Sequence, residues 1–296
     1  MHILITGSKG QLGCELRRLI TTGQAEIGPV SPAYDSAVVD YVDIDDLDIS
    51  DATAVDAWFA DHDPYDLVVN GAAMTNVDGC EAAFDRAFDA NAIGPLNVAR
   101  ACAAQGAKLV HVSTDYVFPG DDPTPRTEKD APRPISAYGR SKLAGEGLAM
   151  AANPATFVVR TAWLYGYEGK NFVKTMLALG ASHDEVTVVD DQLGNPTSAN
   201  DLAFEVLELA LTQDYGIYHC TNEGTCSWAD LAEAAITGRG LPCTVNRCTS
   251  DEWASAHPES ARRPAYSSLE NARLAATVGN RMRPWQEALG TYLSNL

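Results

Sequence analysis

Lysine is scarce in this sequence, and basic residues are few altogether. Lysine and arginine total 21 against 40 aspartates and glutamates, which gives a formal net charge of −19. Such a negative field repels nucleic acid and anionic membrane surfaces, so neither is an expected partner. An acidic, lysine-poor surface is also typical of adaptation to high salt, where dissolved ions screen the self-repulsion. The alternative is an ordinary, well-solvated acidic surface.

Long apolar runs and paired cysteines are also missing. No stretch approaches the roughly 20 apolar residues that a membrane span needs. The seven cysteines are odd in number and form no Cys-x-x-Cys pair, which disfavours a disulfide framework or a zinc site and predicts small buried thiols. We expect no metal site. Segment 1–7 has no basic region and turns glycine-rich at once, so we expect a first strand, not a signal peptide, in a cytoplasmic protein.

Short apolar runs alternate with helical patterns along the first half of the chain. The runs lack polar alternation, as expected for strands that are covered on both faces. This order predicts an α/β fold with a doubly wound parallel sheet. The expected strands are 3–6, 38–42, 67–70, 109–113 and 157–160, and the expected helices are 11–20, 52–60, 81–105 and 137–152.

A glycine-rich turn follows the first expected strand and opens the first helix. Gly7, Gly10 and Gly13 allow a tight turn and a close approach of phosphate oxygens to the backbone. The N–H groups at the start of the helix then face a pyrophosphate. In this position the spacing predicts a Rossmann-type dinucleotide site, the alternative being a purely structural turn.

Acidic residues follow the second expected strand, near the place where such folds hold the adenosine ribose. The carboxylate of Asp43 can accept from both ribose hydroxyls and repels a 2′-phosphate, which favours NADH. Three further aspartates, Asp45, Asp46 and Asp48, compete for that role. After the third strand, segment 70–75 is rich in small residues and allows a cofactor to lie against it.

The second half of the chain is irregular. Segment 23–37 carries Gly, Pro and Ser and predicts a surface insertion before the second strand. A strand is expected at 186–189, with helices near 198–211 and 227–237. We therefore expect a dinucleotide-binding domain over 1–165, with a return segment at 196–220. A smaller mixed α/β domain, mainly for substrate binding, would take up 166–296 and cover the carboxyl edge of the sheet.

The fourth strand runs into a pair of hydroxyl residues, and a Tyr-x-x-x-Lys spacing follows. Tyr138 and Lys142 lie four residues apart, on one face of a helix for which Ser136 is a suitable N-cap. The lysine charge, together with the positive nicotinamide when it is oxidised, is expected to lower the phenol pKa from roughly 10, so that Tyr138 can exchange a proton with a carbonyl oxygen near neutral pH. Thr114 would hold that oxygen, and Lys142 can also bind the nicotinamide ribose.

The ordered glycine turn, Ser-Thr strand and Tyr-x-x-x-Lys helix resemble the extended short-chain dehydrogenases. Finer motifs are similar to the dTDP-4-dehydrorhamnose reductase family, and they span nearly the whole chain. The chain departs from that family at the insertion before the second strand and at Tyr266, where an asparagine is expected. The matching segments are 70–78, 113–118, 138–146, 160–165, 191–197 and 262–264.

The resemblance implies hydride transfer from NADH or NADPH to the 4-keto group of dTDP-4-dehydro-L-rhamnose, which gives dTDP-L-rhamnose. Arg262 and Arg263 would clamp the diphosphate, because guanidinium groups match phosphate geometry. The implied sugar contacts are Val77, Thr114, Asp115 and Trp163. The implied cofactor contacts are Gln11, Leu12, Asp48, Ile49, Ala72, Ala73, Thr75, Tyr138 and Lys142.

Some alternatives remain open at this level. Some family members hold a magnesium ion at a dimer contact with an acidic residue at the position of Glu15, although an exposed glutamate in the first turn of a helix is favoured by the helix dipole alone. The chain would act as a monomer or a homodimer. A different nucleotide-sugar reductase or epimerase is one alternative activity. A non-catalytic regulatory subunit of the methionine adenosyltransferase type is another, and Trp163 argues against it.

Overall fold

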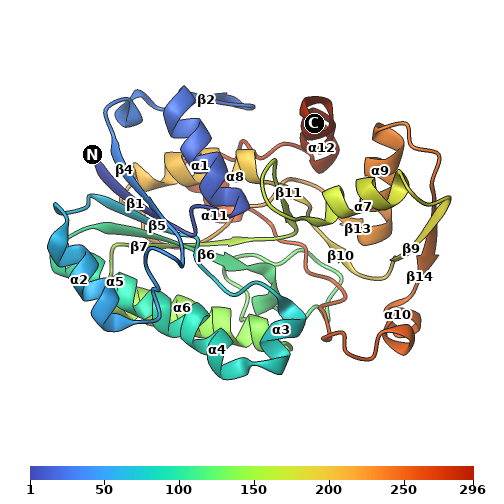
Figure 1. Ribbon diagram of the computed structural model, residues 1–296, viewed down its shortest axis with the longest axis horizontal. Coiled ribbons are helices and arrows are strands. Elements are labelled where there is room, and N and C mark those ends of the chain that lie inside the picture. The colour runs from blue at the N-terminus through green and yellow to red at the C-terminus, as the bar shows by residue number, and fades with distance from the viewer.

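A parallel sheet of six strands forms the centre of the larger of two lobes (Figure 1). The computed structural model describes residues 1–296, and the strand order in this sheet is β12-β7-β6-β5-β1-β4. All five pairings are parallel. The predicted doubly wound α/β fold is therefore confirmed. The strands are β1 (His2–Thr6), β4 (Val38–Val42), β5 (Leu67–Asn70), β6 (Lys108–Thr114), β7 (Thr156–Thr161) and β12 (Gly216–His219).

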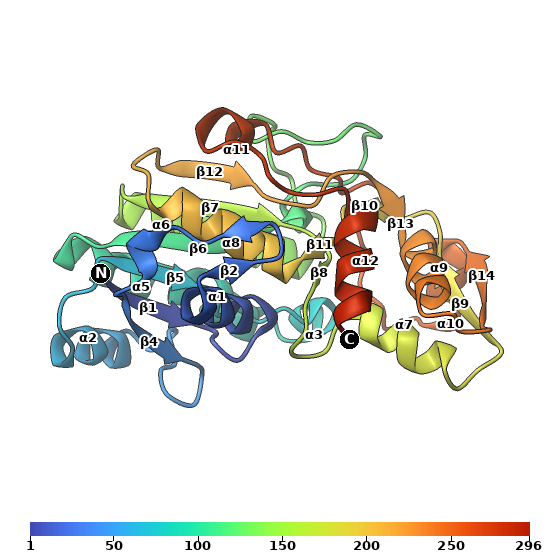
Figure 2. The ribbon, with the colours of Figure 1, turned by 90° about the horizontal axis from the view of Figure 1, so that it is seen from above.

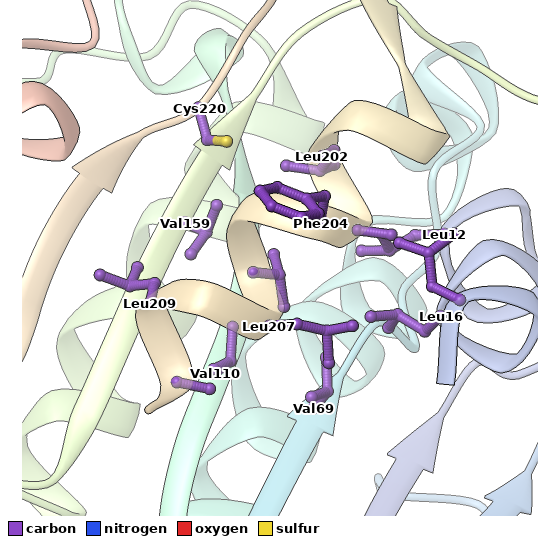
Figure 3. Close-up of a cluster of buried hydrophobic side chains, with 14 of the residues drawn as sticks. Leu12, Leu16, Val69, Val110, Val159, Leu202, Phe204, Leu207, Leu209 and Cys220 are labelled. Carbon is purple, nitrogen blue, oxygen red and sulfur yellow. The ribbon is translucent and has the colours of Figure 1, made fainter. Parts of the chain in front are cut away.

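Helices cover both faces of this sheet. On one face α1 (Gln11–Thr22) packs beside α8 (Ala199–Ala210), and on the other lie α2 (Ala52–Asp61), α5 (Gly94–Gln105) and α6 (Ala137–Ala152) (Figures 1 and 2). Each interface buries a separate apolar cluster. No helix combines the length and the apolar character that a membrane span requires. Figure 3 shows the cluster under α1 and α8, which includes Leu12, Leu16, Val69, Val110, Val159, Leu202, Phe204 and Leu207.

The smaller lobe lies beyond the carboxyl edge of the sheet (Figure 2). Its two-stranded ladders are β9 (Glu185–Val189) with β14 (Thr244–Cys248), in parallel, and β10 (Leu193–Gly194) with β13 (Cys226–Ser227), antiparallel. Between these elements the chain returns to the larger lobe through α8 and β12. The helices beyond the sheet are α7 (Phe172–Gly180), α9 (Trp228–Gly238), α10 (Ser250–Ala256) and α12 (Trp285–Asn295), while α11 (Ala272–Thr277) contacts β12.

Short elements complete the chain. Strand β8 (Leu164–Tyr165) pairs with β11 (Thr197–Ser198) where the two lobes meet. Segment 23–37, which was expected to be a surface insertion, is largely exposed or partly exposed, but it is anchored to the larger lobe. The segment forms a hairpin, β2 (Gln24–Ala25) with β3 (Gly28–Pro29), and buries Tyr34, whose hydroxyl donates to Leu207 O at 2.6 Å. The cysteines are all free, and five of them are buried, as predicted.

The helix expected over 81–105 is not continuous. It is divided into α3 (Val77–Ala82), α4 (Phe84–Phe88), a π-helical turn (Asp89–Ile93) and α5. A Cβ at Gly145 of α6 would lie 2.1 Å from Asn91 O, so α6 passes directly against this turn. The side chain of Asn91 accepts from Met74 N at 2.8 Å and donates to Met74 O at 2.9 Å. Apolar periodicity does not predict this break, and the contacts of Asn91 join segments that are far apart in the sequence.

Candidate active site

A cavity of about 1330 Å³ lies at the carboxyl edge of the sheet and extends under the smaller lobe. The ends of β1, β5, β6 and β7 form one side, and α7, β9, α9 and α10 contribute to the other. In open parallel sheets, ligands bind outside the carboxyl ends of the strands. Of the predicted site residues, the ones that line this cavity are Gly7, Gly10, Gln11, Leu12, Gly13, Asp43, Asp48, Ile49, Ala72, Ala73, Thr75, Val77, Thr114, Asp115, Tyr138, Lys142, Trp163 and Arg263.

The glycine turn leaves the N-terminus of α1 open to the cavity. Gly7 has φ +67°, and a Cβ there would lie 2.7 Å from the backbone N of Ala72, so no side chain fits. Gly10 is the N-cap of α1, and no side chain accepts from the first-turn N–H groups. A helix N-terminus with unsatisfied N–H groups attracts an anion. The turn is therefore suited to hold a pyrophosphate.

An acidic edge lies beside this turn, after β4. The carboxylate of Asp43 accepts from Lys9 N and Ile44 N, each at 2.9 Å. The ammonium of Lys9 lies 2.9 Å from a carboxylate oxygen of Asp45, and both side chains are exposed. The ammonium of Lys9 and the carboxylates of Asp43 and Asp45 therefore lie together at the place expected for the adenosine ribose.

The hydroxyl of Thr114 and the helix that carries Tyr138 and Lys142 line the same cavity. Thr114 ends β6, and α6 begins at Ala137 with Ser136 as its N-cap, whose Oγ accepts from Gly139 N at 3.1 Å. Lys142 is 2 % exposed and donates to Val112 O at 2.6 Å. Burial lowers the pKa of Lys142 from 10.5 to about 8, while the nearby Glu146 carboxylate raises it.

The pKa of Tyr138 is raised in this structure, whereas the motif predicts a lowered value in the presence of the oxidised nicotinamide. Burial raises the pKa of the phenol above its ordinary value of 10. The ring packs edge-on against Tyr116, with the ring centroids 5.7 Å apart. Desolvation penalises the phenolate, and the lysine is held by Val112 O instead. A neutral phenol is a proton donor, which is the form that a carbonyl reduction consumes.

Asp115 is a second titratable group at the end of β6. Its side chain is buried and accepts from Thr114 Oγ1 at 2.9 Å, while Asp115 Oδ2 has no hydrogen-bond partner. Burial raises the pKa of Asp115 to about 6, while the hydrogen bond from Thr114 opposes the increase. An unpartnered buried oxygen at a cavity wall is available to a hydroxyl of a ligand.

A buried ion pair lies behind Lys142. Glu146, one helical turn further along α6, binds Arg160 of β7 at 2.7 and 2.9 Å and accepts from Ser113 Oγ at 2.6 Å. The two charged side chains are only 1 % and 2 % exposed. Motif reasoning did not single out this pair. The signal available was a glutamate at i+4 from the lysine, on the same helix face.

Aromatic side chains form the wall under the smaller lobe. Trp163 stacks on Trp228 with ring centroids 3.6 Å apart and an interplanar angle of 6°, and Phe172 packs on the same partner. Trp228 and Trp253 also line the cavity and were missed, because neither belongs to a recognisable catalytic motif.

The structure separates the two arginines of the predicted diphosphate clamp and buries Glu15, which was expected to be exposed. Arg262 is exposed and does not line the cavity, whereas Arg263 lines it and lies 3.3 Å from Asp78 Oδ2. Glu15 is 2 % exposed and not a surface residue. It binds Arg18 at 2.8 Å and Asn200 Nδ2 at 2.9 Å.

Comparison with known proteins shows which family and fold this chain shares. The family model described as RmlD substrate binding domain matches residues 1–296. A dTDP-4-dehydrorhamnose reductase of Mycobacterium tuberculosis (strain H37Rv) is 40% identical over 99% of this chain and 92% of its own. A crystal structure of a dTDP-4-dehydrorhamnose reductase from Clostridium acetobutylicum matches with a TM-score of 0.92 and 44% identity, covering 100% and 99% of the two chains. The Bacillus anthracis enzyme, solved in complex with NADP, matches with a TM-score of 0.91 and 37% identity over the same shares.

Proposed function

The chain belongs to the RmlD substrate binding domain family, and we propose that it reduces the 4-keto group of dTDP-4-dehydro-L-rhamnose to dTDP-L-rhamnose with NADH or NADPH. One observation carries the proposal. A single cavity joins the open N-terminus of α1 to Thr114, Tyr138 and Lys142. A dinucleotide whose pyrophosphate lies at the N-terminus of α1 can therefore place its nicotinamide beside a ketone that is bound at Thr114 and Tyr138.

The residues present fit a nicotinamide dinucleotide. Its pyrophosphate would lie at Gly10 to Leu12, and its ribose at the acidic edge after β4. Ala72, Ala73 and Thr75 line the cavity between these two ends of the dinucleotide site. Lys142 would hold the nicotinamide ribose. Asp43 favours an unphosphorylated ribose, whereas Lys9 beside it can meet a 2′-phosphate, and one solved relative is described in complex with NADP. We therefore propose that either cofactor is accepted.

The reduced nicotinamide supplies the hydride, and side chains of the protein stabilise and protonate the C4 oxygen of the sugar. As negative charge builds on the C4 oxygen, Tyr138 donates a hydrogen bond to it and then gives up its proton. Thr114 donates to the same oxygen once its hydroxyl turns away from Asp115 Oδ1, which it contacts in the structure. Donors aimed at that oxygen stabilise the transition state more than the ground state. The raised pKa of Tyr138 keeps the phenol protonated until the charge appears. Charged Lys142 then favours the phenolate that remains.

The rest of the cavity is assigned to the nucleotide sugar. We propose that Arg263 binds the diphosphate, that Asp115 accepts from a sugar hydroxyl through its unpartnered oxygen, and that Val77 and Trp163 contact the ring. A cytoplasmic location and a monomeric or homodimeric state stay predictions. No site for Mg²⁺ is proposed, since the Glu15 carboxylate is engaged by an arginine and an amide.

A direct assay tests the function. Purified protein, NADH or NADPH and dTDP-4-dehydro-L-rhamnose are mixed at several salt concentrations, and the nicotinamide absorbance is followed. Stoichiometric loss of absorbance with formation of dTDP-L-rhamnose is expected. Interconversion of sugars without cofactor consumption would indicate an epimerase instead. If no cofactor is oxidised at any salt concentration, the reductase proposal fails and a regulatory role replaces it.

A further inference from the structure

The backbone at Trp163 adopts a conformation that its side chain disfavours. Its φ is +47°, and no other residue except glycine has a positive φ in this structure. A bulky residue in the left-handed region is strained and persists only where its surroundings hold it. Trp163 follows β7 directly and lines the same cavity as Thr114 and Tyr138. What holds this indole therefore bears on the site.

Two residues of the smaller lobe lie directly against the indole of Trp163. Trp228, the first residue of α9, stacks on it almost in parallel, with ring centroids 3.6 Å apart. Gly194 in β10 passes so close that a Cβ there would lie 2.6 Å from Trp163 Cε2. Gly194 pairs with Cys226 in β13, two residues before Trp228, so both constraints come from one small ladder. Phe172 packs against the other partner of the stack, with its ring centroid 4.6 Å from that of Trp228.

We propose that Trp228 and Gly194 are positioning residues for Trp163, which they hold as the sugar-binding wall of the active site. The proposal rests on the proposed function, because it takes the ligand to be a nucleotide-linked deoxysugar. The apolar face and methyl group of such a sugar suit a rigid aromatic wall, since rings supply large contact areas with little loss of conformational freedom. The smaller lobe thereby sets affinity for the sugar, although it contributes no group to the chemical step.

This arrangement predicts a specific pattern of defects. A wall that contacts the sugar in the ground state and the transition state alike contributes to KM and leaves kcat unchanged. An aromatic pair of this kind is expected to be worth about 3- to 10-fold in affinity. The loss should appear with dTDP-L-rhamnose and be absent with dTDP, which lacks the sugar. Binding of NADH or NADPH should not change.

Three variants test the proposal by calorimetry with dTDP-L-rhamnose and dTDP as the probes. Trp228→Leu removes the aromatic ring that stacks on Trp163, and Trp228→Phe keeps a smaller one. Gly194→Ala adds a methyl group that overlaps the Trp163 indole and displaces it. We expect the largest loss of affinity for dTDP-L-rhamnose in Trp228→Leu and partial rescue in Trp228→Phe. The matched control is Trp58→Phe in α2, whose indole donates to Tyr65 Oη at 3.0 Å outside the cavity.

Near-ultraviolet circular dichroism supplies a readout that does not depend on ligand. Two stacked indoles couple their transitions, so the signal should diminish in Trp228→Leu and in Gly194→Ala and persist in Trp58→Phe. If the coupled signal is lost while affinity for dTDP-L-rhamnose stays the same, the proposal is overturned. Equal losses for dTDP and dTDP-L-rhamnose would overturn it as well. If the wild type binds both probes but oxidises no NADH or NADPH, the proposed function fails while the binding comparison still decides the role of Trp228.

Discussion

Replacing Glu146 by glutamine removes one charge from the buried pair behind Lys142 and keeps the shape of the side chain. Arg160 donates to both carboxylate oxygens, and its guanidinium also lies 5.1 Å from the ring centroid of Phe118. Neither charged side chain is more than 2 % exposed. In Glu146→Gln the arginine charge therefore stays buried without a counter-charge.

Breaking a buried pair in this way costs about 3–5 kcal/mol. The entropy of unfolding is about 2.1 cal/mol/K per residue, or about 0.6 kcal/mol/K for a chain of this length, so the Tm should fall by roughly 5–8 °C. The matched control is Glu233→Gln. Glu233 lies 2.8 Å from Arg247, but the two side chains are 60% and 41% exposed, and such a pair is worth about 0.2–1 kcal/mol. Scanning calorimetry of the two variants provides the comparison.

The same variant should alter the pH dependence of activity. The Glu146 carboxylate raises the pKa of Lys142 against the effect of burial, and the balance is about 8. Since the charged lysine is the active form, kcat/KM should fall as pH rises through this value in the wild type, and at lower pH in Glu146→Gln. A Tm no lower than that of the control, together with an unmoved alkaline limb, would refute the account of the pair.

Four further predictions follow from the site and the surface. Tyr138→Phe should lower kcat by about 10²–10⁴ through loss of the proton donor, with NADH affinity little changed, as stopped-flow and fluorescence titration would show. Gly10→Val should fold, because a Cβ there has one neighbour at 3.1 Å, yet lose dinucleotide binding in calorimetry. Arg263→Ala should raise KM about tenfold or more, whereas Arg262→Ala should leave it unchanged in the same steady-state assay. If the net charge of −19 reflects adaptation to high salt, the Tm should rise by several degrees between about 0.1 M and 1 M KCl, and a constant Tm would exclude it.

Several parts of the fold and the site follow from short stretches of sequence. Apolar runs of strand length predicted β1, β4, β5, β6 and β7 to within one residue at each end. The buried strands β1, β5, β6 and β7 need no polar alternation, whereas β4 is a partly exposed edge strand. The glycine turn before α1 is predicted from Gly7, Gly10 and Gly13, which are close in the sequence. The pairing of Tyr138 with Lys142 on one helix face, capped by Ser136, depends only on helical spacing.

Other features were decided by contacts between segments far apart in the sequence. Burial is a sum over the whole fold, so neither the raised pKa of Tyr138 nor the enclosure of Glu15 can be obtained from neighbouring residues. The π-helical turn packs directly against Gly145 of another helix, a contact that local spacing does not predict. The stacking of Trp163 on Trp228 joins residues of different lobes, so only the tertiary structure shows that the two form one wall of the cavity. Local spacing determines which groups one helix or strand can present together, and only the packing of the lobes determines what surrounds them.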